Sequence, residues 1–139
     1  MVPVNYLAVL ACVVVAMVLG YVWYGPLFGK EWMRLMGMSG EPMGGGSKNM
    51  GMLYGIQAVG ALLMAFVMSH ALIFAMAYLH TTGISAGLQT GFWNWLGFIA
   101  PVTVGMVLWE GKPWKLWMIV AGYWLVVMCT MGIILSLWQ

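Results

Sequence analysis

Polar side chains inside long apolar segments are the first place to look for chemistry in this chain of 139 residues. His70 interrupts one apolar run, Asn94 interrupts the next, and Glu110 follows the end of the run that contains Asn94. An ionisable group is costly in lipid, so each one there is a candidate for function by default. The three residues could line a polar pathway. The structural alternative is that His70 hydrogen-bonds a neighbouring carbonyl and that Glu110 clamps a turn by pairing with a nearby cation.

Methionine sulfur offers a second kind of chemistry, because thioethers are soft ligands that suit Cu(I). Methionines at MxxM and MxM spacings flank a glycine-rich segment: Met33, Met36, Met38, Met50 and Met52. The alternative is that Met serves as adaptable apolar filler, since no Cys or His lies in the cluster. Cys12 and Cys129 show no ligand spacing and are expected to be small packing residues. No cofactor is predicted.

Enzyme motifs are absent from the sequence. The chain has no Asp, and Glu31, Glu41 and Glu110 form no pair at helical spacing, so general acid–base catalysis by paired carboxylates is not expected. The segment from Gly44 to Lys48 lacks the spacing of a phosphate-binding loop. A net charge of +2 without a basic stripe is no nucleic-acid footprint. We therefore expect neither an enzyme nor a nucleic-acid-binding protein.

Composition indicates that the surroundings of this chain are lipid. It is 64% hydrophobic and 6% charged, whereas soluble domains have about 45–50% apolar and about 25% charged residues. In lipid every backbone N–H and C=O must be paired internally, which leaves helices or closed barrels. The apolar runs are continuous rather than alternating, so helices are favoured. The N-terminus lacks the positive region of a signal peptide, and cleavage is not expected.

Four apolar runs reach the about 20 residues that a helix needs to cross a bilayer. They cover residues 3–24, 51–79, 85–109 and 114–138. Residues 27–38 interleave charged and apolar residues and predict a short amphipathic helix at the membrane surface. The predicted fold class is an all-α integral membrane protein with four transmembrane helices and one interfacial helix, in a single domain of residues 1–139.

The basic residues predict the orientation of the chain in the membrane. All of them follow the first or the third span: Lys30, Arg34, Lys48, Lys112 and Lys115. The connection after the second span and the two tails contain none. Loops rich in Lys and Arg stay in the cytoplasm. We therefore expect a multi-pass protein of the plasma (bacterial inner) membrane with both termini on the non-cytoplasmic side.

Small residues on the third span predict a helix-packing seam, because they let helix backbones approach closely. The residues of this predicted seam are Gly83, Gly87, Gly91, Asn94, Gly97 and Gly105. Ala61, Ala65 and Ser69 form a matching ridge on the second span.

A weak internal repeat also relates the first and third spans. A shift of 85 residues aligns Gly20 with Gly105 and Lys30 with Lys115. The repeat favours two parallel two-helix units, an arrangement known in transporters. The alternative is that small, aromatic and basic residues recur at every cytoplasmic boundary.

Two segments carry a resemblance to a known family. Residues 24–33 and 97–116, together with Asn5 and Gly122-Tyr123, resemble the bacterial and fungal membrane family called domain of unknown function 1761. The turn from Trp109 to Trp114 is the most specific part, whereas residues 37–52 match no family pattern. The resemblance implies a compact four-helix membrane protein and brings no activity. A shared site would involve these matching positions, with Lys112 in the same turn: Tyr24, Pro26, Trp32, Trp109, Glu110, Pro113 and Trp114.

Three functions are consistent with these features. The first is a non-enzymatic membrane protein that acts by helix packing, as a homo-oligomer or as an accessory subunit of a larger complex in the lipid bilayer. The second is a small transporter or channel that uses His70, Asn94 and Glu110. The third is Cu(I) binding by the methionines. We expect the first, because the sequence offers too few polar groups for the second and only soft ligands for the third.

Overall fold

The computed structural model describes residues 3–38 and 49–139, and the regular elements of those residues are all helical. The helices are α1 (Tyr6–Val22), η1 (Trp23–Leu27), α2 (Gly29–Leu35), α3 (Met50–Leu79), α4 (Gly83–Asn94), η3 (Trp95–Ile99), α5 (Ala100–Thr103), α6 (Gly105–Leu108) and α7 (Trp114–Leu137). The two elements labelled η are π-helical turns. Four segments are long and apolar enough to span a membrane: Tyr6–Leu27, Met50–Leu79, Gly83–Leu108 and Trp114–Leu137. The predicted fold class is confirmed, and α2 lies within the predicted interfacial segment.

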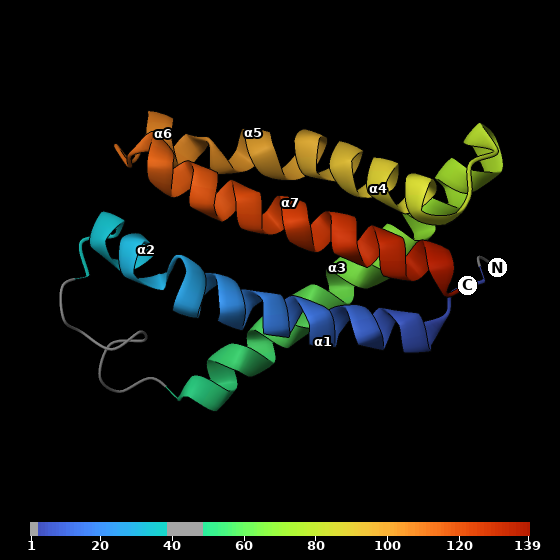
Figure 1. Cartoon of the computed structure of the whole chain (residues 1–139), viewed down its shortest axis with the longest axis horizontal. Coiled ribbons are helices and arrows are strands. Elements are labelled where there is room, and N and C mark those ends of the chain that lie inside the picture. Colours follow the sequence, from blue (N-terminus) through green and yellow to red (C-terminus); the bar gives the residue numbers. More distant parts are fainter. Residues whose placement is uncertain (1–2, 39–48) are drawn as a thin grey trace.

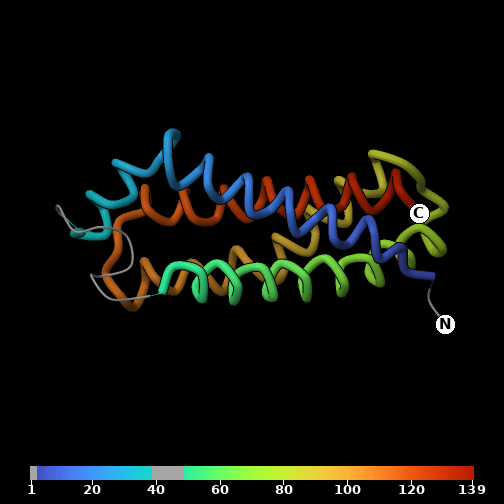
Figure 2. The backbone as a smooth tube through the Cα atoms, turned by 90° about the horizontal axis from the view of Figure 1, so that it is seen from below, coloured from blue at the N-terminus to red at the C-terminus, as the bar shows by residue number. Residues whose placement is uncertain are grey.

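Helix α7 is the central element of an elongated bundle (Figure 1). Helix α4 runs along one side of α7, and α1 packs against the other. Helix α3 crosses α1 at an angle and forms a separate layer in the turned view (Figure 2). With 30 residues, α3 is about 45 Å long at 1.5 Å per residue. That length exceeds the about 30 Å of the hydrocarbon core, so this span must tilt or protrude.

Asparagine side chains begin the first two spans. The Asn5 Oδ1 atom accepts hydrogen bonds from the N–H groups of Leu7 and Ala8, and Asn49 does the same for Gly51 and Met52. Capping of this kind pairs N–H groups that the first helical turn leaves open. Each asparagine therefore fixes the residue at which its span begins.

The first and third spans each contain a π-helical turn. In η1, Phe28 N–H donates to the carbonyl of Trp23, five residues back, around Pro26, which has no N–H. The chain at Gly25-Pro26 is therefore a wide turn that keeps the backbone paired. In η3, Ala100 N–H donates to the carbonyl of Trp95, just before Pro101. Both turns begin with the sequence Trp-x-Gly.

The core consists of small and flexible side chains at the crossing of α1, α3 and α7. Its buried members include Ala8, Cys12, Ala16, Ala61, Ala65, Met68, Ser69, Leu72, Val127, Met131 and Leu135. Cys12 Sγ contacts the carbonyl of Met131 at 3.8 Å, which agrees with the packing role that we expected. Small side chains at these positions let the helices approach.

Both chain ends and the His80 turn lie at one end of the bundle (Figure 1). His80 closes α3 in the left-handed conformation, with φ of 52°. Helix α2 and the turn between α6 and α7 lie at the opposite end. The side of the membrane that each end of the bundle faces stays a prediction. The repeat predicted at an offset of 85 residues stays a prediction.

Candidate functional site

The structure does not bring the three predicted pathway residues together. His70 Nδ1 donates to the Phe66 carbonyl at 2.9 Å, and Asn94 Nδ2 donates to the Thr90 carbonyl at 2.8 Å, each within its own helix. Glu110 is exposed in the turn before α7. The local hydrogen bond of His70 is the structural alternative described above. Polar groups that are paired locally need no pathway to explain them.

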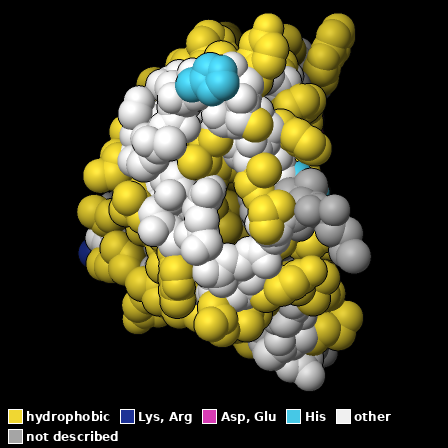
Figure 3. Space-filling model, turned by 90° about the vertical axis from the view of Figure 1, so that its right-hand side faces the viewer, with side chains coloured by type: hydrophobic (Ala, Val, Ile, Leu, Met, Phe, Trp, Pro, Cys, Tyr) yellow, Lys and Arg dark blue, Asp and Glu magenta, His cyan; other side chains and the backbone are white. Residues whose placement is uncertain are grey.

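A small pocket lies instead between the chain ends and α3. It has a volume of about 20 Å³, which is room for about one water. Its lining residues are Pro3, Val4, Asn5, Ser69, Leu72, Ile73, Leu135, Trp138 and Gln139. None of the three pathway residues lines it. Seen from this end, the surface shows apolar side chains around backbone and uncharged polar atoms, with no acidic side chain in view (Figure 3).

The closest helix contact is a glycine seam between α4 and α7. A Cβ atom on Gly87 would overlap the backbone of Gly132, and one on Gly91 would lie 2.6 Å from the Met128 carbonyl oxygen. The seam was predicted on α4, but its nearest neighbours belong to α7 and not to the ridge on α3. Gly132 is the residue that sequence reasoning missed.

The observed seam includes fewer glycines than the sequence predicted. Gly83 and Gly97 have no heavy atom within 4 Å of a built Cβ, and Gly105 meets only the Trp109 side chain, at 3.7 Å. These three glycines are therefore outside the contact. The π-helical turn η3 changes the helical phase between Gly91 and Gly97, which explains why the pattern does not continue.

Two tryptophans hold α7 from opposite sides. Trp23 Nε1 donates to the Ile119 carbonyl at 3.1 Å, and Trp95 Nε1 donates to the Ala121 carbonyl at 2.8 Å. Residues two positions apart on an α-helix point about 200° apart. Each tryptophan is the first residue of a π-helical turn, so η1 and η3 are both hydrogen-bonded to the same turn of α7. Trp95 was absent from the predicted site residues, although Trp-x-Gly at both turns was a signal for it.

The positions that carry the family resemblance gather at the α2 end of the bundle. Tyr24 lies 5.5 Å from Trp32 and 5.1 Å from Tyr123, measured between ring centroids. This aromatic cluster joins η1, α2 and α7. Pro26 lies in η1, Pro113 caps α7, and the Lys112 N–H donates to the Met106 carbonyl at 3.0 Å. Trp109, Glu110 and Trp114 are exposed at the same end.

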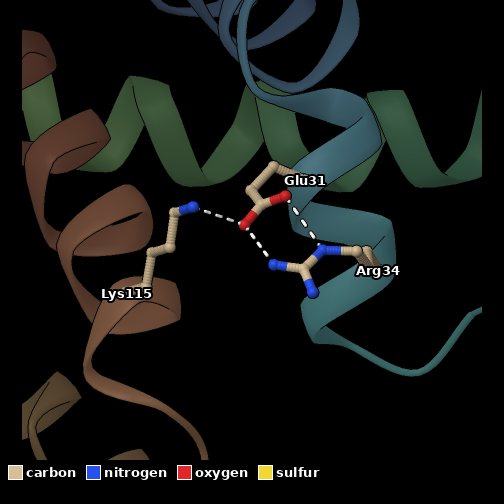
Figure 4. Close-up of polar contacts among 3 residues, drawn as sticks. All are labelled: Glu31, Arg34 and Lys115. Atoms are coloured by element: carbon tan, nitrogen blue, oxygen red, sulfur yellow. Dashed lines mark hydrogen bonds and ion pairs between the residues drawn. The ribbon is translucent and has the colours of Figure 1, made fainter.

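Glu31 is the acidic residue that joins elements here. Its carboxylate receives two hydrogen bonds from Arg34, at 2.6 and 3.0 Å, and lies 2.6 Å from Lys115 Nζ (Figure 4). The hydrogen bond from Arg34, followed by that from Lys115, lowers the pKa of Glu31 to about 2. Lys115 lies in the first turn of α7, where a cation opposes the helix dipole. Glu31 offsets that charge and links α2 to α7.

That clamp role was predicted for Glu110. Among residues 3–38 and 49–139, both ion pairs are made by Glu31 and neither by Glu110. Lys115, one of the cations near that turn, pairs instead with a carboxylate of α2.

The methionine hypothesis is not tested by these contacts. Met33 and Met36 lie on or next to α2, and Met50 and Met52 are exposed at the start of α3. Met43 and the segment around it lie outside the described residues. Within the described part of the chain, no group of three or more His, Cys, Asp and Glu side chains could hold a metal ion.

Comparison with known proteins identifies a family. The family model described as "Protein of unknown function (DUF1761)" matches residues 7–136. No curated protein matches, and no solved structure matches.

Proposed function

Since the chain belongs to the DUF1761 family, whose description assigns no activity, we propose a function from its geometry. The protein is a non-enzymatic, multi-pass membrane protein that acts by binding other membrane-spanning helices. Its partner is a second copy of itself or a subunit of a larger complex. The third span, Gly83–Leu108, carries the binding surface.

The observation that carries this proposal is the exposure of the least apolar span. Within Gly83–Leu108 the most apolar stretch of 18 residues has a mean hydropathy of 1.4, against 2.1 to 2.4 for the corresponding stretches of the other three spans, and only 6% of that stretch is buried within the chain. The corresponding stretch of α7 has a mean hydropathy of 2.2 and is 44% buried. A lone chain in lipid would be expected to expose its most apolar span. Here the least apolar span is the most exposed one, which favours a protein partner that covers the third span.

The exposed side chains of the third span fit helix contact. Trp93, Phe98 and Val102 are exposed by more than half of their surface, and open space surrounds Gly97. In lipid, small residues allow close approach of a second helix, and aromatic side chains supply contact area. Gly97, which was predicted to pack inside the chain, is available on this surface instead.

The proposed orientation follows from charge. The described basic residues, Lys30, Arg34, Lys112 and Lys115, belong to the α2 end, which the positive-inside tendency places in the cytoplasm. The chain ends then face the non-cytoplasmic side of the plasma (bacterial inner) membrane. A non-enzymatic role is supported by His70 and Asn94, whose polar atoms already bond their own helices.

Gentle extraction from the native membrane tests the proposal, followed by native mass spectrometry of the purified species. We expect either a species of two or more 15.3 kDa chains or a defined complex with foreign subunits. Gly97→Leu should break the assembly, because the side chain fills the surface that the partner approaches. Gly55→Leu is the matched control, since Gly55 on α3 also has open space around it. A monomer in every mild detergent and in nanodiscs would reject the proposal.

A further inference from the structure

All charged side chains of the described residues belong to the α2 end of the bundle. Four are basic, Lys30, Arg34, Lys112 and Lys115, and two are acidic, Glu31 and Glu110. Residues 3–29 and 49–109 contribute no Asp, Glu, Lys or Arg. This end therefore carries a local positive excess, while the end with the termini carries no charged side chain apart from the chain ends.

Glu31 neutralises only part of that excess. Its single carboxylate pairs with both Arg34 and Lys115, and its pKa of about 2 keeps it charged at neutral pH. The trio therefore retains one positive charge. Lys30 adds a second, and it lies four residues before Arg34, on the same face of α2.

The cations keep donors that point away from the ion pair. The side chains of Arg34 and Lys115 remain 66% and 60% exposed. A guanidinium has five N–H donors and an ammonium has three, so the contacts to Glu31 use only a part of them. The ion pairs thus hold two cations in fixed positions while leaving N–H groups free for an anion.

Aromatic side chains place these cations at headgroup depth. Trp109 and Trp114 are exposed at the same end, 87% and 56% of their surface respectively. Exposed tryptophans of membrane proteins gather at the level of the lipid headgroups. Beneath the basic residues, Trp32 of α2 is anchored on Tyr24. Side chains of this kind mark the interface, so we expect α2 and its cations at the level of the headgroups.

We propose that Lys30, Arg34 and Lys115, the α2–α7 basic face, bind the phosphate of an anionic phospholipid headgroup such as phosphatidylglycerol. Charge complementarity and interfacial depth both favour this occupant over a zwitterionic lipid, whose own ammonium would face the cations. Binding at this face does not depend on whether a protein covers the third span.

The test is native mass spectrometry of the full chain released from nanodiscs of equal parts phosphatidylglycerol and phosphatidylcholine. We expect retained lipid to be enriched in phosphatidylglycerol. Lys30→Gln should lower that enrichment about fivefold, the effect of one basic residue near an anionic surface. This variant leaves the Glu31 ion pairs intact, and a thermal melt checks its fold. The matched control is Lys112→Gln, which removes the same charge from the neighbouring turn and should change the enrichment less.

Three outcomes would overturn the proposal. Equal retention of the two lipids would show that the face does not select anionic headgroups. An equal loss in Lys30→Gln and Lys112→Gln would show that net charge, and not this face, sets the preference. Displacement of the lipid by inorganic phosphate at matched concentration would show a site for free phosphate rather than for a lipid.

Discussion

Replacing Gly91 by alanine tests the glycine seam at the centre of the bundle. The added Cβ would lie 2.6 Å from the Met128 carbonyl oxygen and 2.7 Å from Cys129 Cα. An ordinary van der Waals contact of a carbon atom is about 3.5–4.0 Å, so α4 and α7 would have to separate by about 1 Å. The atoms that must move belong to the backbone, and no side chain can rotate away.

The expected cost of this separation is about 1–3 kcal/mol, the usual range for overpacking a well-packed contact. Alanine also stabilises a helix over glycine by about 0.5–1 kcal/mol, which offsets part of the cost. The control Gly55→Ala gains the same helix term without a clash, because a Cβ there meets no heavy atom within 4 Å. The difference between the two variants therefore isolates the clash.

Reversible unfolding in mixed micelles, with an increasing fraction of denaturing detergent, measures both free energies. We expect Gly91→Ala to be less stable than Gly55→Ala by about 1–3 kcal/mol. Equal stabilities would refute the seam, because they would mean that α4 and α7 do not touch through their backbones at this position.

Three further perturbations test other contacts. Trp95→Phe should lose about 0.6–1 kcal/mol of stability with its hydrogen bond to the Ala121 carbonyl, whereas Trp93→Phe, an exposed neighbour, should lose less; equal losses in the unfolding assay would contradict the role of that bond. Thr90→Val should stabilise the fold by about 1 kcal/mol, because Thr90 Oγ1 is buried without a partner among the described residues, and a destabilised variant would reveal a partner. The pKa of Glu31 is lowered from 4.5 to about 2, so its ion pairs should hold α2 against α7 fully above pH 4.5 and release it as the pH falls to about 2. Fluorescence of a label on α2 follows the release. A release of α2 near pH 6 would contradict the prediction.

The spans could be predicted because composition alone decides them. Continuous apolar runs and a connection of a few polar residues fix where a helix can cross a bilayer, whereas the caps at Asn5 and Asn49 were not among the predictions. The order of the helices in space could not be predicted in the same way. The most apolar 18-residue stretches of the other three spans have mean hydropathies of 2.1 to 2.4, so hydropathy does not distinguish the central α7 from α1 or α3.

The sequence predicts which end of the molecule holds the candidate site, but not which residues are in contact there. Tyr24, Trp32 and the turn after the third span were placed at one membrane boundary, and the structure gathers them there. The ion pair between Glu31 and Lys115 joins residues 84 positions apart, and no local sequence spacing predicts it. Gly132 was missed for the same reason, since a lone glycine in a span shows its partner only after α4 and α7 are packed.

The most direct test of the proposed function is the surroundings of the third span. A spin label on a single cysteine at Val102, 74% exposed in the chain, reports access to dissolved oxygen in native-lipid nanodiscs. Cys12 and Cys129 are first replaced by alanine, and Val18 of α1, 56% exposed, is the matched position. If a protein partner covers the third span, the label at residue 102 should be several-fold less accessible than the label at residue 18. Equal, high accessibility at both positions would mean that lipid surrounds the third span, and the proposal would fail.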